Sequence, residues 1–333
     1  MSKRFWSLLL SVAIGLMAFP QLPPKVDYSV VSVSEEAGTD FTKITSAGDY
    51  VALPQVKRGA SGLSWLTNRI IDISPDGNTL AFVSARNNTT NIFLTDINRQ
   101  SGTVQRTKRA AVLDFSFSPD GKNIVFSEIQ GNDILIFATD AKDGYICRQI
   151  TSANKDVSPV YSKRNDRIFF CRMEYRGTSV WGYNLKNHSL SSYFAGMNPH
   201  PIPDDDVMII AKTNAQGRSE IWRVNTATGV EECIISSLEH SFTSPTLSPD
   251  GKWLLFVGDG QRIMPNGRRF FNTDLFAARS DGSALTQLTY HAADDLSPVW
   301  SRDGRYIYFV SQRGDTDGTA NIWRMSFNLD HNP

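Results

Sequence analysis

The stretch Ser248-Pro249-Asp250-Gly251-Lys252-Trp253-Leu254-Leu255-Phe256 decides the fold, because the same motif returns along the whole chain. Its first four residues suit a tight turn, since proline sets the backbone for the second position of a type I turn and glycine suits the last. The run that follows has the branched and aromatic side chains of a buried strand. The motif therefore predicts a turn that leads into a strand.

Six copies of this motif are present, two of them degenerate. The fourth residue of each turn is residue 77, 121, 165, 205, 251 or 304, so the spacings are 44, 44, 40, 46 and 53 residues. Every copy is followed by a second apolar run, at 91–94, 133–136, 179–182, 220–223, 274–277 and 321–324. A period of roughly 40–50 residues with several strands per period is typical of a propeller. We therefore predict an all-β fold, a six-bladed β-propeller of four-stranded antiparallel blades.

The last blade needs a strand from elsewhere in the chain. The chain ends at Pro333, soon after the third strand of the sixth copy. Near the N-terminus, Phe41-Thr42-Lys43-Ile44-Thr45 resembles the outer-strand stretches Arg148-Gln149-Ile150-Thr151 and Thr286-Gln287-Leu288-Thr289. We predict that this N-terminal strand closes the last blade. The alternative is that residues 26–45 form an unrelated cap.

The first residues are typical of a targeting segment. Lys3 and Arg4 precede an apolar run from Phe5 to Phe19, and prolines follow. This pattern indicates a secretory signal and is too short for a comfortable transmembrane helix, although an uncleaved anchor is the alternative. We expect a signal peptide at 1–20, an N-terminal extension at 21–39 and the propeller at 40–333, in a periplasmic or secreted protein without a stable membrane span. The 34 basic and 34 acidic residues balance, so no nucleic-acid partner is predicted.

The repeat resembles that of a known propeller family. The segment from Leu285 to Gly314 contains Leu285-Thr286-Gln287-Leu288-Thr289 and Ser297-Pro298-Val299-Trp300-Ser301-Arg302-Asp303-Gly304, and it is similar to the WD40-like repeat of TolB propellers. Residues 73–86 match the pattern again, and the resemblance covers about residues 40–327. It implies a periplasmic setting and docking within an envelope complex. We expect this chain to lack the α/β domain that precedes the propeller in TolB proteins. The family resemblance does not fix the function, because one propeller scaffold hosts many functions.

No pattern of catalytic or metal-ligating residues stands out. The five histidines are not spaced as ligands on one element would be, and no Gly-x-Ser-x-Gly elbow of the related propeller hydrolases is present. The recurring aspartates are explained by turn chemistry. Asp204-Asp205-Asp206 either holds a cation or forms a solvated turn, and we favour the turn. The sequence therefore predicts no cofactor, no metal and no catalytic residue.

The irregular residues gather on one face of the predicted ring. Strands alternate in direction, so the turn motifs share one face, and the loops between second and third strands share the other with the connections between blades. Insertions at 55–69 and 261–271 fall on this second face. Arginine and aromatic residues in protruding loops are typical of protein contact surfaces, although these side chains could simply be solvated or packed into a blade. The candidate partner-binding residues are Arg262, Arg268, Arg269, Phe270, Trp65, His200, His240 and Asp295.

Three hypotheses for function follow. The first is a non-catalytic, monomeric propeller that docks an envelope protein or peptide on the second face. The second is a propeller that binds a small ligand, such as a sugar or peptide, in its central channel. The third is a lyase or hydrolase that works at the channel mouth with His200, His240 and Asp295. A cluster of perturbed titratable groups at the mouth would favour the third hypothesis.

Overall fold

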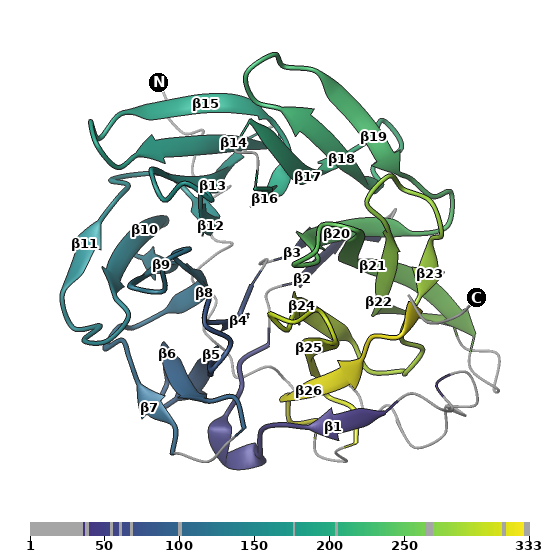
Figure 1. The fold of residues 1–333 in the computed structure, drawn as a ribbon, viewed down its shortest axis with the longest axis horizontal. Helices are drawn as coiled ribbons and strands as arrows, with labels where there is room; N and C mark the ends of the chain where they lie inside the picture. Colours follow the sequence, from purple (N-terminus) through teal and green to yellow (C-terminus); the bar gives the residue numbers. More distant parts are fainter. Residues whose placement is uncertain are drawn as a thin grey trace, which may run out of the picture.

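The computed structural model describes residues 36, 40–53, 56–59, 62–66, 69–98, 102–175, 177–203, 206–263, 269–314 and 318–329. These residues form six four-stranded sheets and one two-stranded hairpin. Figure 1 shows the six sheets as blades around a common centre. The predicted six-bladed propeller is therefore confirmed.

Within each of the first five blades, the strands follow chain order from the centre to the rim, and in the sixth the N-terminal strand is outermost. The first three blades are β4 (Ile71–Ile73), β5 (Thr79–Arg86), β6 (Thr89–Asp96) and β7 (Val104–Gln105); β8 (Val112–Phe117), β9 (Asn123–Gln130), β10 (Asp133–Asp140) and β11 (Cys147–Gln149); and β12 (Asp156–Tyr161), β13 (Arg167–Glu174), β14 (Gly177–Asn184) and β15 (Leu190–Ala195). The last three are β16 (Met197–Pro201), β17 (Val207–Thr213), β18 (Ser219–Asn225) and β19 (Glu231–Ile235); β20 (Ser241–Leu247), β21 (Trp253–Ile263), β22 (Arg269–Arg279) and β23 (Thr286–Gln287); and β24 (Asp295–Trp300), β25 (Tyr306–Ser311), β26 (Asn321–Ser326) and β1 (Phe41–Lys43).

The N-terminal strand closes the sixth blade, as predicted. β1 pairs antiparallel with β26, with Thr42 opposite Arg324. The pairing continues past the strand, because the Ile44 amide donates to the Ile322 carbonyl at 2.8 Å. The short 3₁₀ turn η2 (Ala47–Asp49) then leads the chain toward the first blade, where Val51 bridges to Ser84 of β5. The two ends of the chain therefore meet in one sheet.

Each complete turn motif is held by the same hydrogen bonds. In the turn before β21, the Ser248 hydroxyl donates to Asp250 Oδ1 at 2.7 Å, and the Trp253 amide donates to Ser248 Oγ at 2.9 Å. The Ser248 hydroxyl bond is the main reason that the pKa of Asp250 is lowered. Gly251 has φ +76°, a left-handed conformation that favours glycine. The same set recurs at Ser74, Ser118 and Ser301, so turn chemistry explains the repeated aspartates.

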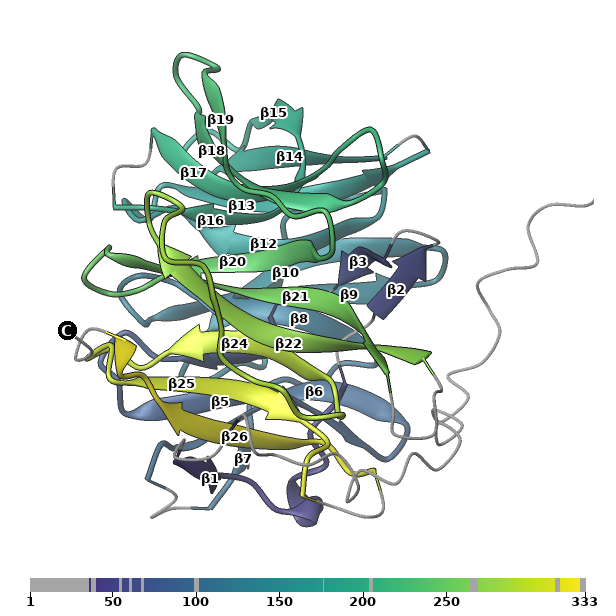
Figure 2. The ribbon, with the colours of Figure 1, turned by 90° about the vertical axis from the view of Figure 1, so that its right-hand side faces the viewer.

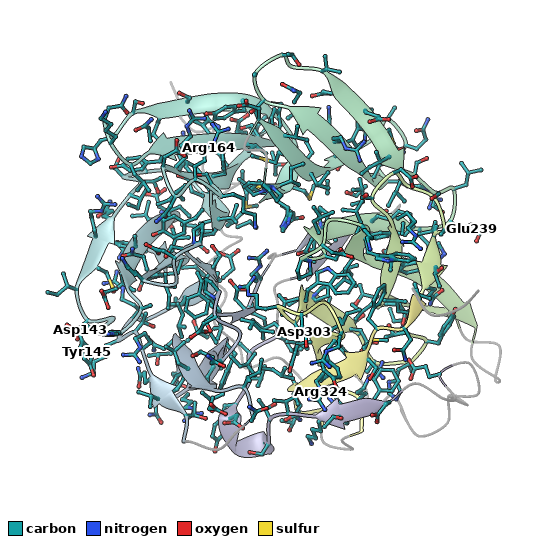
Figure 3. All side chains as sticks on the ribbon, in the orientation of Figure 1. Asp143, Tyr145, Arg164, Glu239, Asp303 and Arg324 are labelled. Atoms are coloured by element: carbon teal, nitrogen blue, oxygen red, sulfur yellow. The ribbon has the colours of Figure 1, made fainter. Side chains whose placement is uncertain are left out.

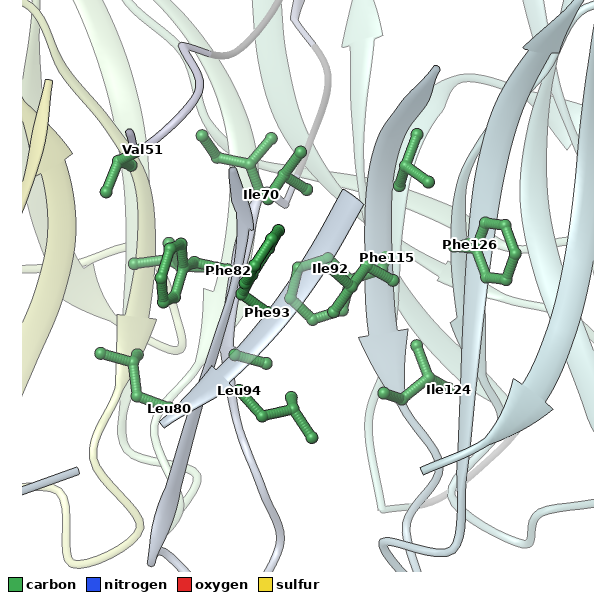
Figure 4. Packing of buried hydrophobic residues seen from close by; sticks show 14 of the residues in the cluster. Val51, Ile70, Leu80, Phe82, Ile92, Phe93, Leu94, Phe115, Ile124 and Phe126 are labelled. Atoms are coloured by element: carbon green, nitrogen blue, oxygen red, sulfur yellow. The ribbon is translucent and has the colours of Figure 1, made fainter. Parts of the chain in front are cut away.

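The hydrophobic core lies between the blades. In the first blade, Phe82 and Phe93 stack with ring centroids 6.2 Å apart, and Phe115 of the next blade belongs to the same buried cluster (Figure 4). Because each sheet is covered on both faces by its neighbours, the second strands read as continuous apolar runs. This packing fixes the blades as a rigid frame for the loops at both faces.

Candidate functional site

The centre of the ring is hollowed where the turn motifs gather. A cavity of about 320 Å³ is lined by residues of all six blades, so it is the mouth of the central channel on the turn face. Asp303, in the turn of the sixth blade, lies closer to the ring centre than the rim residues Tyr145 and Glu239 (Figure 3). In four blades the second turn residue that lines the mouth is a proline, namely Pro75, Pro119, Pro203 and Pro249. In the other two blades this position carries a cation, Lys163 or Arg302.

Positive charge predominates at this mouth. Its described lining holds the cations Arg69, Lys163 and Arg302 and one carboxylate, Asp72. The Asp72 oxygens accept the backbone amides of Ile73 at 2.9 Å and Phe117 at 3.0 Å. Arg69 Nη1 lies 3.6 Å from Asp72 Oδ2, so its side chain runs down the channel toward the turn face. Arg302 donates to the backbone carbonyls of Ser74 and Ile73, which carry no net charge.

His200 lies at this mouth and not on the interblade-loop face where the sequence analysis placed it. It is the fourth residue of the inner strand β16, pairs with Ile209, and is only 7% exposed. Its Nε2 accepts the Leu247 amide at 3.2 Å, so in the neutral ring the proton sits on Nδ1. Burial, with Lys163 and Arg69 nearby, lowers the pKa of His200 well below its usual value. The Nδ1–H has no hydrogen-bond partner in the described protein.

A belt of polar side chains links neighbouring blades along the channel wall. The Thr243 hydroxyl donates to Asn198 at 2.6 Å, and the Ser158 amide donates to Asp114 Oδ2 at 3.0 Å. Ser158 and Asn198 have φ +55° and +52° at the bulges of β12 and β16. The bulges re-aim these side chains at the next blade. The belt therefore holds the inner strands in register with one another.

Asp114 makes the stability of this belt depend on pH. Burial raises the pKa of this carboxyl to about 6, against hydrogen bonds from Ser127 and Ser158 that lower it. The folded protein therefore holds this proton more tightly than the unfolded chain, so the contribution to stability is full below about pH 4 and is lost as pH rises through about 6. We expect Asp114→Asn to remove a pH-dependent difference on the order of 3 kcal/mol between pH 4 and pH 7.

Chemical denaturation of the wild-type and Asp114→Asn proteins across this range measures the effect as a difference between the two curves. The turn aspartates, whose pKa values are lowered, act in both proteins and cancel in that difference. Parallel curves from pH 4 to pH 7 would contradict the assignment.

The other two histidine and carboxylate candidates lie at the opposite end of the inner strands. Asp295 is the first residue of β24, fully buried, and paired with Arg313 Nη2 at 2.5 Å. His240 directly precedes β20, bonds the Asp259 carbonyl through Nδ1 at 2.8 Å and packs on Phe242. The structure therefore does not bring His200, His240 and Asp295 together. Asp295 is buried and pairs with Arg313, so it stabilises the fold.

The remaining candidates belong to two hairpins. Arg262 lies in β21, Arg269 and Phe270 lie in β22, and Trp65 lies in the hairpin of β2 (Val56–Gly59) and β3 (Gly62–Leu66). Their side chains, and all of Arg268, lie outside the described residues. Figure 2 shows both hairpins on the same side of the ring, with the β2–β3 hairpin near its centre. The backbone thus places both insertions on the predicted face.

Two arginines, Arg86 and Arg313, bind the N-terminal segment. Arg86 Nη2 donates to the Asp49 carbonyl at 3.1 Å. Arg313 pairs with Glu36 at 3.2 Å as well as with Asp295. The sequence analysis missed these contacts, because no local pattern marks Glu36 as a partner.

Among the described residues, no group of three or more His, Cys, Asp or Glu side chains is arranged to hold a metal ion. No helix in this part of the chain is long and apolar enough to cross a membrane.

Comparisons with known proteins agree with the architecture. Two solved structures are similar: a putative TolB from Agrobacterium tumefaciens (16% identity, TM-score 0.60, 80% of this chain and 93% of that one) and TolB from Acinetobacter baumannii (17%, 0.60, 75% and 64%). An oligogalacturonate lyase from Vibrio parahaemolyticus is also similar (12%, 0.58, 89% and 96%). At these identities the likeness shows the fold alone, and the fold is shared by enzymes.

Sequence comparisons identify the family. An uncharacterized protein of Agrobacterium fabrum is 28% identical over 129 residues, which are 38% of this chain and 39% of that protein. The chain thus spans about two fifths of the length of this curated relative. Residues 68–265, more than half of the chain, match the family described as TolB beta propeller domain (PD40). The chain belongs to the TolB beta-propeller family.

Proposed function

We propose that this chain is a non-catalytic, periplasmic or secreted propeller that docks a partner protein of the cell envelope on its interblade-loop face. The observation that carries the proposal is the projection of two hairpins from this one face. β21 and β22 have eleven residues each, whereas the second and third strands of the other blades have six to eight. At least three additional residues at about 3.3 Å each extend this hairpin roughly 10 Å or more beyond the corresponding hairpins of the other blades.

Exposed apolar side chains lie on the same face. Tyr175, in the loop between β13 and β14, is 99% exposed, and Leu238, in the connection before β20, is 91% exposed. Tyrosine is enriched at protein interfaces, where it supplies a large apolar area and a polar end. Both side chains lie on the face from which the two hairpins project, and we infer that they belong to the same contact surface. The N-terminal pattern of Lys3, Arg4 and the following apolar run supports export.

The hairpin arginines test the docking face. A partner is first captured from an envelope extract with the mature protein and identified, and its affinity is then measured by titration calorimetry. We expect joint charge reversal, Arg268→Glu with Arg269→Glu, to weaken binding by about 2 kcal/mol or more, because arginine is a frequent hot spot. The melting temperature should stay within about 1–2 °C of wild type, since exposed substitutions change stability little.

Two controls separate the faces. Lys122→Glu with Lys252→Glu reverses exposed cations on the turn face and should leave partner affinity unchanged. Gly251→Val, in the left-handed turn position, should lower stability but not affinity in the folded fraction. Equal loss of affinity from both charge-reversed pairs would refute the proposed face, and unchanged binding by the Arg268 and Arg269 variant would remove the hairpin from the site.

A further inference from the structure

The turn-face mouth of the channel has the features of a built ligand site. It is a concave space bounded by six rigid inner strands, and its volume of about 320 Å³ is at the lower end of the range for small-molecule sites. It lies at the end of the channel opposite to the proposed docking face.

His200 supplies a buried donor with no acceptor. Its Nε2 is occupied by the Leu247 amide, so the unpartnered atom is the protonated Nδ1. Asp72 is the corresponding residue of the first blade. It accepts a hydrogen bond from the Phe117 amide, and Phe117, like Leu247, is the residue directly before the turn motif of the next blade. His200 thus repeats the structural bond of Asp72 and adds a donor that the fold leaves unused. A buried donor without a partner is destabilising, and a hydrogen-bond acceptor on a ligand would remove that cost.

Three cations, Arg69, Lys163 and Arg302, line the same cavity as this donor. With Asp72 as the one carboxylate of the described lining, the formal charge of these described residues is three minus one, or +2. Arginine and a neutral imidazole N–H are donors only, so they match a ligand that accepts hydrogen bonds and carries negative charge.

Apolar side chains form part of the rest of the wall, although Ser118, Tyr161, Thr246 and Ser248 also line it. Val160 and Val299 occupy the positions of the third and sixth blades that correspond to His200, and the turn prolines form the rim. Apolar side chains of this kind pack against the carbon skeleton of an organic ligand. The negative Asp72 at one wall also disfavours a ligand that brings two or more charges to the same point.

We propose that the turn-face mouth of the channel is a carboxylate-binding site, in which His200 Nδ1–H, Arg69, Lys163 and Arg302 receive the carboxylate of an organic acid or of a peptide. The apolar side chains of the wall hold the carbon chain of the ligand. Lys163 and Arg302 contribute to the selectivity for charge, because in their two blades a cation replaces the proline of the turn motif.

Titration calorimetry with matched probes tests the site and distinguishes the two sources. The probes are succinate and its neutral diamide, a tripeptide with a free C-terminal carboxylate and the same tripeptide amidated, and inorganic phosphate. We expect each carboxylate to bind at least about tenfold more tightly than its neutral match. Binding of succinate indicates a free acid as ligand, and binding of the free tripeptide alone indicates a peptide segment.

Variants locate the binding. Lys163→Gln and Arg302→Gln should each weaken carboxylate binding about tenfold or more, whereas Lys122→Gln, an exposed turn lysine outside the mouth, should not. His200→Gln retains an acceptor for the Leu247 amide and a donor, so it should bind better than His200→Phe. The Nδ1–H resonance of His200 should move when succinate is added and stay in place with the diamide.

The proposal is overturned if carboxylates and their neutral matches bind equally, or if neither carboxylate binds. It is also overturned if phosphate binds as tightly as the better carboxylate, or if both Lys163→Gln and Arg302→Gln retain full affinity in proteins with wild-type melting curves.

Discussion

Deletion of residues 26–45 is expected to lower the melting temperature by on the order of 10 °C or more and to make the protein associate. This segment contains β1, the outer strand of the sixth blade, and Glu36, which is buried. Without it, β26 becomes an unpaired edge, and exposed edges pair with other chains. The loss exceeds that of a single substitution, because several backbone hydrogen bonds and buried contacts disappear at once.

Three sets of contacts carry the expected loss. The backbone of Phe41 to Lys43 pairs with β26, and the Thr45 hydroxyl accepts the Ile322 amide at 2.8 Å. The Phe41 ring packs edge-on against Phe309 at 6.2 Å between centroids. The Glu36 carboxylate accepts the amides of Tyr290 at 2.6 Å and His291 at 3.1 Å. These contacts join the N-terminal segment to the last blade and to the connection before it.

Calorimetry and light scattering measure the two effects, and complementation supplies the control. A synthetic peptide of residues 36–48 added to the truncated protein should raise its melting temperature in proportion to the logarithm of peptide concentration, because it binds only the folded state. A peptide of the same composition in scrambled order should not. A truncated protein that melts like wild type and stays monomeric would show that closure does not depend on this strand.

The parts of the fold that the sequence predicted are those fixed by local chemistry. A turn such as Ser248 to Gly251 needs only its own hydroxyl, carboxylate and glycine, so its pattern survives in any blade and counts the repeats. The closing strand was predictable because Phe41 to Thr45 resembles outer strands elsewhere in the chain. Both inferences rest on similarity between repeats, and neither requires knowledge of distant contacts.

The candidate site was less predictable, because its residues come from six blades and lie together only in the closed ring. His200 was placed on the wrong face, since the inner strand of its degenerate repeat was read as a connection and not as a strand. Lys163 and Arg302 did carry a signal, the replacement of proline in the turn motif, but only the ring brings the two positions to one cavity. Glu36 carried none, because its partners lie more than 250 residues away.

Arg313→Met is expected to destabilise the protein by about 3–5 kcal/mol, because it leaves two buried carboxylates without their cation. Arg313 is 4% exposed and contacts Asp295 at 2.5 Å and Glu36 at 3.2 Å. Burial works to lower the pKa of this guanidinium, but Asp295 and Glu36 outweigh it and raise the pKa. Burial also raises the pKa of Asp295, against the lowering effect of Arg313. The three charges therefore stabilise the fold only as a set.

A cycle of variants separates this ion triad from simple loss of packing. The guanidinium also lies 4.3 Å from the centre of the Phe41 ring, and methionine retains part of that apolar contact. If uncompensated charge is the cause, the triple variant Glu36→Gln, Asp295→Asn, Arg313→Met should be more stable than Arg313→Met alone, by about 1–3 kcal/mol in denaturant unfolding. The single variant should also regain stability as pH falls, because protonation of Asp295 relieves the buried charge. A triple variant no more stable than Arg313→Met, with no such pH response, would mean that Arg313 acts by packing.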